Sequence, residues 1–362
     1  MSTTTTTQSD HVLNTQLRAR QYPEPLSVTG ALDQFKHEEL TPVIGREYHN
    51  VNLVDDILNA KNSDELIRDL AITISERGVV FFRSQDNLTN DLQKSLVQRL
   101  GELVGKPSDS TLHIHPLLNG THEFGVDDNE ISTISSLAFR VLSIGQKDRD
   151  DRKGGAASWH SDIQFEPYPA DYTSLRLTQL PSTGGDTLWA SGYELYDRFS
   201  DQYKKFFEGL TATFTGEGFI KAAEARPDKF KIYEEPRGSP GNTGSELTAV
   251  HPVVRTNPVT GWKSIYAIGN FPQRINELSA RESRELLDTL YRRIQDNHDL
   301  QVRFKWRNEN DIAFWDNRSA FHSATNDYDH LGDRVGHRAV GIGEKPYLDP
   351  RSQSRTVALS GN

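Results

Sequence analysis

The feature that most constrains the fold is a series of short strand-like segments, separated by turn residues, that starts at residue 159. TSLRLTQL is followed by the turn-prone PSTGGDT and then by TLWAS, and strand-like pieces return in HPVVRT, WKSIYAIG, LQVRFKW, DIAFWD and GHRAVGIG. Short strands with Gly- and Pro-rich turns are typical of sandwiches and barrels. Because strands lie both before and after a helix-bearing segment, we expect one β-sandwich or barrel decorated by helices.

Amphipathic segments predict the helices that flank this β region. NSDELIRDLAITISER places apolar residues at helical spacing, and Asn62 and Glu65 are arranged as a capping box. Thr89 is expected to open a second helix, and Ser279 and Glu282 form another capping box ahead of ESRELLDTLYRRIQD. The apolar run GVVFF, residues 78–82, fits a buried strand, and a helical segment is expected near 193–210. EEPRGSPGNTGSE predicts an exposed loop or insertion.

The domain organisation follows from these patterns. Residues 1–25 are rich in Thr and Gln without a periodic apolar face, which predicts a disordered N-terminal arm. We expect a single domain over 26–350, with a helical insert around 193–246, and a C-terminal tail over 351–362. A chain of 362 residues can bury a sizeable core in one large β-rich domain.

Charge and cysteine content exclude several function classes. The chain has 41 basic and 51 acidic residues and a formal charge of −10, so diffuse attraction to nucleic acid or to an anionic membrane is not expected. An anionic small molecule must then be captured by specific cations. The absence of cysteine restricts any metal ligands to His, Asp or Glu. Without a secretory signal or an apolar run of about 18 residues, a cytoplasmic protein is expected.

The stretch SWHSDIQF raises the possibility of a metal site. On an extended strand His160 and Asp162 would point to one face and could bind one ion. A solvated pair or an ordinary hydrogen bond would explain the same triplet. A third ligand is available downstream as His322, in FWDNRSAFHSATNDY. Two His and one carboxylate leave adjacent metal positions open, which suits Fe(II) that binds a chelating cosubstrate and O2.

Five motifs in one order resemble a known family. WHSD, PSTGGDTLWAS, HPVVRTNPVTG, DIAFWDNRSAFHSATNDY and a closing Arg-x-x-x-Arg are similar to those of the taurine dioxygenase family of Fe(II)/2-oxoglutarate-dependent oxygenases, of fungal type. The similarity runs from about residue 40 to about residue 348. It implies a mainly β fold with flanking helices and a double-stranded β-helix core, the jelly roll of cupin-like proteins. It also implies a homo-oligomer, dimeric or tetrameric.

The resemblance assigns roles in metal and cosubstrate binding. His160, Asp162 and His322 match the family's iron ligands. Thr187, in GGDTLW, and Arg334 match the pair that holds the distal carboxylate of 2-oxoglutarate. A planar guanidinium suits a carboxylate bidentately, and a hydroxyl adds a directional donor beside it. Taken alone, Thr187 would be a turn residue after Gly-Gly and Arg334 a solvated arginine.

The substrate side is also implied by the resemblance. His115, in LHIHP, and Arg338, in GHR, match the residues that hold the sulfonate in sulfonate-using members. A tetrahedral anion needs donors from several directions, which a cation and an imidazole N–H supply. Phe165 resembles an aromatic of the pocket wall, although ordinary core packing would explain it equally. His113 is expected to be structural.

Departures from the family pattern bear on the substrate. Taurine-specific members have Asn four residues before the first iron-binding His, where this chain has Ala156, and SIYAIGNF lacks the usual Val-Asn pair. The spacing from His322 to Arg334 is longer by one residue, so Arg334 depends on the Arg-x-x-x-Arg pattern. We expect hydroxylation of a small anionic organic substrate, a sulfonate other than taurine, with release of sulfite and an aldehyde.

Alternatives to a sulfonate substrate stay open at this point. The same cations could hold a carboxylate, such as an aryloxyacetate or a biosynthetic intermediate, or a sulfate ester. A more remote alternative is a β-barrel that binds an anion or a metal without oxidative chemistry. Residues 117–157 and 216–246 are expected to form the loops that select the substrate.

Overall fold

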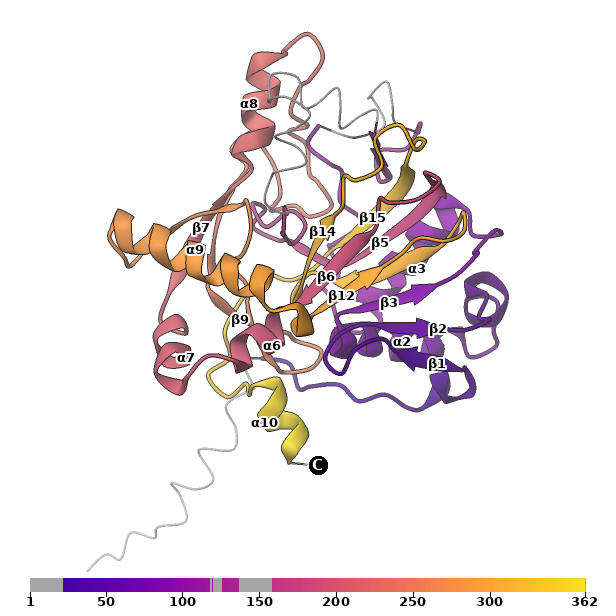
Figure 1. Ribbon diagram of the computed structural model, residues 1–362, viewed down its shortest axis with the longest axis horizontal. Coiled ribbons are helices and arrows are strands. Elements are labelled where there is room, and N and C mark those ends of the chain that lie inside the picture. The colour runs from indigo at the N-terminus through magenta and orange to yellow at the C-terminus, as the bar shows by residue number, and fades with distance from the viewer. Residues whose placement is uncertain (1–21, 118, 120–125, 137–157, 362) are drawn as a thin grey trace, which may run out of the picture.

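Two β-sheets face one another across an aromatic core (Figure 1). The computed structural model describes residues 22–117, 119, 126–136 and 158–361. Within this described part the larger sheet has the strand order β1-β2-β3-β13-β5-β15-β4, with β1 (His37–Glu39), β2 (Arg46–Tyr48), β3 (Val79–Phe82), β13 (Ile312–Asp316), β5 (Ala170–Gln179), β15 (Val335–Ile342) and β4 (Ser132–Ser135). The smaller sheet has the order β12-β6-β14, with β12 (Gln301–Phe304), β6 (Thr187–Ser191) and β14 (Ala320–Ala324).

Alternation along the central strands explains how the larger sheet is buried on both faces. In β3, Val79 and Phe81 point into the core between the sheets, whereas Val80 and Phe82 belong to the core on the opposite face. Successive side chains of a strand point to opposite faces, so a strand covered on both sides consists entirely of apolar residues. The ring of Phe81 stacks on that of Phe304 from the smaller sheet, with centroids 4.0 Å apart. The predicted buried strand is therefore confirmed.

Two helices cover the outer face of the larger sheet, α2 (Ser63–Arg77) and α3 (Asn90–Glu102) (Figure 1). Both were predicted, and the Thr89 hydroxyl caps α3 by accepting a hydrogen bond from the Leu92 N–H. The capping box predicted for α2 is wrong, because the Asn62 side chain makes no capping hydrogen bond to the backbone. Its amide instead lies 3.4 Å from the Glu65 carboxylate, so the two side chains bond each other rather than the helix end.

A second layer of elements packs around the smaller sheet and carries its own core. The sheet β11-β7-β8 lies beside α9, and the pair β10-β9 lies beside α6. The capping box predicted for α9 between Ser279 and Glu282 is confirmed. The elements of this layer are α6 (Gly192–Asp197), α7 (Asp201–Phe207), β7 (Thr211–Thr215), α8 (Glu217–Ala225), β8 (Thr248–Pro252), β9 (Val254–Thr256), β10 (Lys263–Ile265), β11 (Pro272–Ile275) and α9 (Ala280–Asp296). The remaining elements are η1 (Ala31–Gln34), η2 (Leu53–Leu58), η3 (His298–Leu300) and α10 (Arg355–Ser360).

The region predicted as a helical insert and exposed loop contains more structure than expected. Residues 193–246 include β7 as well as helices, and α8 projects from the molecule at the top of Figure 1. The exposure predicted for EEPRGSPGNTGSE is wrong at Arg237, Ser239 and Asn242, which are buried. Arg237 is buried because its guanidinium pairs with a carboxylate inside the protein. The predicted N-terminal arm lies outside the described residues except for 22–25, where the Tyr22 ring stacks on Tyr347.

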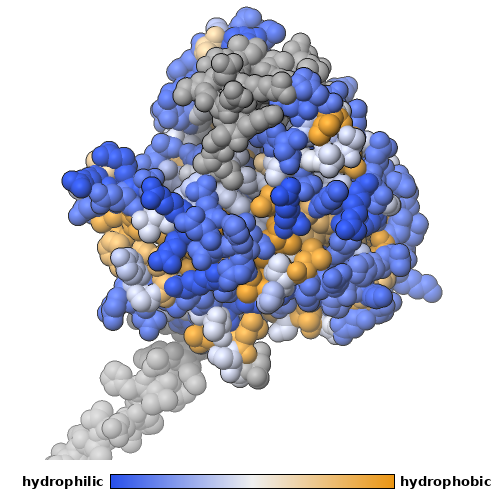
Figure 2. All heavy atoms as spheres, viewed as in Figure 1, coloured by the Kyte–Doolittle hydropathy of each residue, from blue (hydrophilic) through white to orange (hydrophobic). Residues whose placement is uncertain are grey.

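The surface is consistent with the polar composition. Figure 2 shows a face that is mostly hydrophilic, on which hydrophobic residues form small separate groups. None of the helices in the described ranges is both long enough and apolar enough to cross a bilayer.

Candidate active site

The predicted metal ligands converge at one edge of the smaller sheet. His160, Asp162 and His322 each offer one ligand atom, and these three atoms lie within 4.8 Å of one another. His322 lies on β14, and its backbone forms an isolated bridge with His160. The N–H of each residue donates to the carbonyl of the other, at 3.1 and 2.8 Å, and the two rings lie 4.2 Å apart. Segments far apart in the sequence thus bring both imidazoles together.

The segment that carries His160 and Asp162 is not the regular strand that the sequence suggested. His160 takes part only in the isolated bridge, and Asp162 begins a turn. The next residue, Ile163, has φ +48°, which is a rare conformation for a β-branched side chain. Gly269 has φ +102°, and a Cβ there would lie 2.2 Å from the Trp159 carbonyl oxygen. Tertiary packing rather than strand alternation therefore sets the direction of the carboxylate.

Burial and neighbouring charges hold all three side chains in the forms that bind metal. Burial lowers the pKa of His160, and burial together with the nearby His160 lowers the pKa of His322 to about 3. Burial alone would raise the pKa of Asp162, but the Arg338 guanidinium and the two histidines lower it to about 2. The His160 Nδ1 lies 2.7 Å from the Ser158 carbonyl oxygen, which can only accept, so Nδ1 carries the proton and Nε2 is free to act as a ligand.

Arg338, predicted to bind the substrate, lies directly at the triad. From β15 its Nη1 donates to the Asp162 Oδ1 at 2.7 Å. Three buried atoms here have no hydrogen-bond partner among the described residues: Asp162 Oδ2, His322 Nδ1 and Arg338 Nε. Buried polar atoms are usually hydrogen-bonded, and the clustering of these three around one point suits a bound ion or ligand.

Thr187 and Arg334, the predicted 2-oxoglutarate pair, contact one another. The Arg334 Nη2 donates to the Thr187 Oγ1 at 3.2 Å, and the Trp306 Nε1 donates to the same oxygen at 3.1 Å. Arg334 is 4% exposed, yet it forms no ion pair with a carboxylate of the described residues. Gly185 lets the arginine approach, because φ is +69° and a Cβ would lie 2.9 Å from the Arg334 Cδ. Trp306 was not predicted.

His115 and Phe165 lie in an aromatic wall that leads to the triad. The His115 ring contacts Phe219 of α8 at 4.9 Å, and Phe219 lies 5.6 Å from Phe165. Phe271 lies 5.2 Å from Phe165 and 6.2 Å from the His160 ring. The His115 Nδ1 accepts the Leu117 N–H at 3.0 Å, so its Nε2 carries the proton of the neutral ring. Phe219 and Phe271 were missed, because isolated phenylalanines carry no local pattern that separates a pocket wall from core.

A buried ion pair anchors the 226–247 segment beside this wall. Arg237 donates to both oxygens of Glu166, at 2.5 and 3.0 Å, and also to the carbonyls of Tyr233 and Gly244. His113 lies 3.4 Å from the same carboxylate, which agrees with the structural role expected for it. The sequence did not predict this pair, because its two members are far apart along the chain and Arg237 lies in a Pro/Gly-rich stretch.

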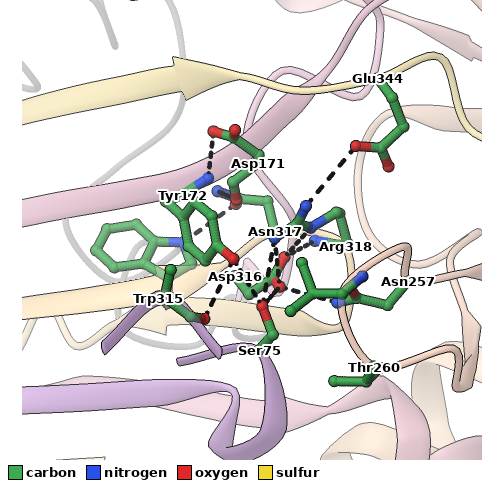
Figure 3. Close-up of polar contacts among 12 residues, drawn as sticks. Ser75, Asp171, Tyr172, Asn257, Thr260, Trp315, Asp316, Asn317, Arg318 and Glu344 are labelled. Carbon is green, nitrogen blue, oxygen red and sulfur yellow. Dashed lines mark hydrogen bonds and ion pairs between the residues drawn. The ribbon is translucent and has the colours of Figure 1, made fainter. Parts of the chain in front are cut away.

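A second charged cluster lies next to the triad, within the WDNR sequence of residues 315–318 (Figure 3). Asp316 accepts hydrogen bonds from the Arg318 guanidinium at 2.7 and 2.9 Å, from Ser75 at 2.7 Å and from Asn257 at 2.8 Å. Asn317 points toward the segment of Asp162, whose N–H donates to its Oδ1 at 3.0 Å. Asn317 lies within a motif that resembles the family, but no role was predicted for it.

Part of the predicted substrate region lies outside the described residues. Ala156 is not described, and of the loop 117–157 only residues 117, 119 and 126–136 are.

Comparisons with known proteins show which family and which structures this chain resembles. The family model described as "Taurine catabolism dioxygenase TauD, TfdA family" matches residues 36–340. An alpha-ketoglutarate-dependent dioxygenase from Aspergillus oryzae is 48% identical over 94% of this chain and 97% of its own length. An alpha-ketoglutarate-dependent sulfonate dioxygenase from Saccharomyces cerevisiae is 30% identical over 87% of this chain and 69% of its own length.

A solved structure confirms the predicted fold. The crystal structure of a taurine dioxygenase from Burkholderia xenovorans aligns with a TM-score of 0.62 and 25% identity, over 88% of this chain and 92% of that one. The mainly β architecture with flanking helices is thus the double-stranded β-helix that the motifs implied.

Proposed function

Because this chain belongs to the taurine catabolism dioxygenase TauD/TfdA family, and is an alpha-ketoglutarate-dependent dioxygenase, we propose that it hydroxylates a small anionic substrate with Fe(II) held by His160, Asp162 and His322. The observation that carries the proposal is the convergence of these three side chains within 4.8 Å. Two imidazoles and a carboxylate form the donor set of the facial triad that binds ferrous iron and leaves adjacent positions open. Membership of this dioxygenase family excludes the alternative hypothesis of a β-barrel without oxidative chemistry.

The donor set fits a metal ion in its protonation as well as its geometry. Both imidazoles are neutral and the carboxylate is ionised at neutral pH, and ligands must be deprotonated to bind a metal. The hydrogen bond from His160 Nδ1 to the Ser158 carbonyl orients the ring that would present Nε2. Ferrous iron, when bound, supplies the O2 activation that couples decarboxylation of 2-oxoglutarate (alpha-ketoglutarate) to substrate hydroxylation.

Arg334 and Thr187 would hold the distal carboxylate of 2-oxoglutarate. A buried guanidinium without an anionic partner is unfavourable, and burial lowers the pKa of Arg334. A carboxylate that accepts from the guanidinium would relieve this. The Thr187 oxygen already accepts from Trp306 and Arg334, so its own proton is oriented away from both and can be donated to the same carboxylate.

His115 and Arg338 would bind the anionic group of the substrate. The His115 Nε2–H is a donor, and burial keeps the pKa of this ring well below its ordinary value, so it binds as a neutral group. Arg338 supplies the positive charge, while one of its nitrogens stays on Asp162. Phe165, Phe219 and Phe271 would then contact an apolar substrate body between the anion and the metal ligands.

These contacts suit the anionic group of a sulfonate, and Ala156 in place of the Asn of taurine-specific members favours a sulfonate other than taurine as substrate. A hydroxyl group placed on the carbon that bears the sulfonate gives an unstable adduct, which loses sulfite and leaves an aldehyde. A sulfate ester or a carboxylate presents similar oxygens to the same donors, and the products distinguish the three. A cytoplasmic location is a further part of the proposal, as is a dimer or tetramer, which rests on the family resemblance.

Two measurements test the proposed function. Anaerobic addition of Fe(II) and 2-oxoglutarate should produce a visible charge-transfer band, and no band should form with the His322→Ala variant. A panel of sulfonates, sulfate esters and carboxylates should then be assayed for succinate, with sulfite, sulfate and aldehyde measured in parallel. Succinate formation with carboxylates alone would overturn the sulfonate assignment, and absence of the band would overturn the metal site.

A further inference from the structure

Asn317, labelled in Figure 3, is a buried asparagine. Its side chain joins the metal-ligand segment to the larger sheet. It lies in the turn between β13 and β14, and β14 carries His322. Its Oδ1 accepts from the Asp162 backbone N–H at 3.0 Å and from the Trp315 Nε1 at 3.1 Å. Its Nδ2 donates to the Thr173 Oγ1 at 2.8 Å and to the Asp171 carbonyl at 3.2 Å.

These four hydrogen bonds permit only one orientation of the amide. An asparagine amide has two donor hydrogens and an oxygen with two lone pairs, and all are used here. Of the three groups that contact Oδ1, the Ser161 hydroxyl is the most distant, at 3.4 Å, and the other two are N–H donors, so a flipped amide would set its NH2 against both of them. The side chain therefore forms a rigid connection between β5, the indole of Trp315 and the backbone of Asp162.

The turn after Asp162 needs such a connection. Ile163 has φ +48°, a left-handed conformation that an isolated β-branched residue avoids and that persists only where surrounding contacts impose it. The Ser161 hydroxyl donates to the Asn317 carbonyl at 2.7 Å, so both residues before Ile163 are bonded to Asn317. The backbone bridge attaches His160 to His322 on β14. Asn317 holds the following residues, Ser161 and Asp162, and so holds the part of the segment that carries the carboxylate.

A competing force acts on the same carboxylate. Arg338 lies 2.7 Å from the Asp162 Oδ1, and its attraction would draw the side chain toward the guanidinium if the turn could move. We propose that Asn317 is a positioning residue, which keeps the Asp162 carboxylate directed at the metal by holding the strained turn. The inference rests on the proposed function, because it requires a metal at the triad.

Metal affinity, rather than turnover, is the measurement that tests this role. The metal-free protein is titrated with Co²⁺, and binding is followed by the visible absorption of the ion, which also reports its coordination geometry. In Asn317→Ala we expect affinity to fall by about 10- to 100-fold, as is usual when an outer partner of a metal ligand is lost. Ser161→Ala removes the hydroxyl that donates to the Asn317 backbone carbonyl but keeps the bond from Asn317 to the Asp162 N–H, so Co²⁺ affinity should fall by a smaller factor. It also provides the test if Asn317→Ala does not fold.

Asn257→Ala is the matched control. Asn257 is equally buried, donates to Asp316 at 2.8 Å and accepts from the Val259 N–H at 2.9 Å, but bonds to none of the three ligands. Both asparagine variants should lower the thermal midpoint of the metal-free protein, and only Asn317→Ala should weaken Co²⁺ binding.

The outcomes separate this inference from the proposed function. If the wild-type protein binds no Co²⁺, the metal site itself is overturned. If the wild type binds Co²⁺ and the folded Asn317 and Ser161 variants bind it equally well, only the positioning role is overturned. Equal weakening in Asn257→Ala would also overturn it, because the effect would then reflect a general loss of packing.

Discussion

Two carboxylate–arginine pairs with buried carboxylates lie near each other in this protein and differ in how completely their polar atoms are bonded. Both oxygens of Asp316 accept hydrogen bonds, from Arg318, Ser75 and Asn257 (Figure 3). Asp162 accepts from Arg338 through Oδ1, whereas its Oδ2 and the Arg338 Nε have no partner among the described residues.

The pKa values alone do not distinguish these pairs. Burial would raise the pKa of either carboxyl, and the adjacent arginine lowers it in both. The difference lies in hydrogen bonding: both oxygens of Asp316 are bonded, whereas the unpaired atoms of the Asp162 pair gather beside His322, where a bound ion or ligand would complete them. The comparison therefore favours a structural role for the Asp316 pair and supports the proposed metal-binding role of the Asp162 pair.

Removing the carboxylate of the fully bonded pair should have the largest effect. Asp316→Ala removes the carboxylate that is hydrogen-bonded to Arg318, whose side chain is 2% exposed, and leaves it only the more distant Glu344 carboxylate at 3.7 Å among the described residues. Loss of one member of a buried pair costs about 3–5 kcal/mol of unfolding free energy. Urea denaturation measures this, with Glu285→Ala in the exposed Arg281–Glu285 pair as the control that should change little. A small effect of Asp316→Ala would contradict the supporting role.

Asp162→Ala should reduce activity strongly and the unfolding free energy less than Asp316→Ala does. Succinate formation should fall by at least about 100-fold, because loss of a direct ligand should cost no less than the largest effects of losing an outer partner. The unfolding free energy of the metal-free protein should fall less than in Asp316→Ala, since the Arg338 side chain is 12% exposed and can reach water. Coupled succinate assays and urea curves give both numbers. Undiminished turnover would end the metal assignment.

His251 tests whether an unpaired buried atom is sufficient to identify a functional group. Its Nδ1 has no partner among the described residues, and burial, with Arg255 nearby, lowers the pKa of the ring to about 3. An unfolded histidine has a pKa of about 6.5, so between these values only the unfolded state binds the proton. The unfolding free energy should therefore decrease as pH falls below about 6.5, by up to about 1.4 kcal/mol per pH unit for this group.

The His251→Gln variant isolates that contribution. The side-chain amide of the introduced glutamine can still donate to the backbone carbonyls of Gln164 and Glu166, which the His251 Nε2 contacts at 3.0 Å. The pH dependence of urea unfolding between pH 6 and 4 should become shallower by about one proton, with succinate formation at pH 7 unchanged. The exposed His298→Asn variant should keep the wild-type pH profile. A large loss of turnover in His251→Gln would assign this residue to the site.

The smallest effect is expected at Trp306. Trp306→Phe removes the indole donor to the Thr187 hydroxyl but keeps an aromatic ring in the core. A single hydrogen bond contributes about 0.5–1.5 kcal/mol, so the KM for 2-oxoglutarate should rise about two- to tenfold. Steady-state succinate assays measure this, with Trp262→Phe as the matched control. An unchanged KM would mean that Thr187 does not need the indole to bind the cosubstrate.

Local patterns predicted much of the fold and less of the site. Helical spacing and caps identified α2, α3 and α9, and the apolar run at 78–82 identified β3. The same reasoning failed for the Asn62 side chain, which bonds Glu65, and for the burial of Arg237, whose partner Glu166 is distant in sequence. Trp306 and Phe219 were missed because the roles proposed for them depend on which residue each contacts across the core.

The sequence by itself determined the strand and helix pattern, the absence of thiolate ligands and the family motifs that contain the three candidate ligands. Only the tertiary structure decided that His160 and His322 share a bridge and that Asp162 lies in a strained turn bonded to Asn317. The physical reason is that side-chain periodicity is a property of neighbouring residues. The direction of a carboxylate is instead set by hydrogen bonds between segments that meet only after the chain has folded.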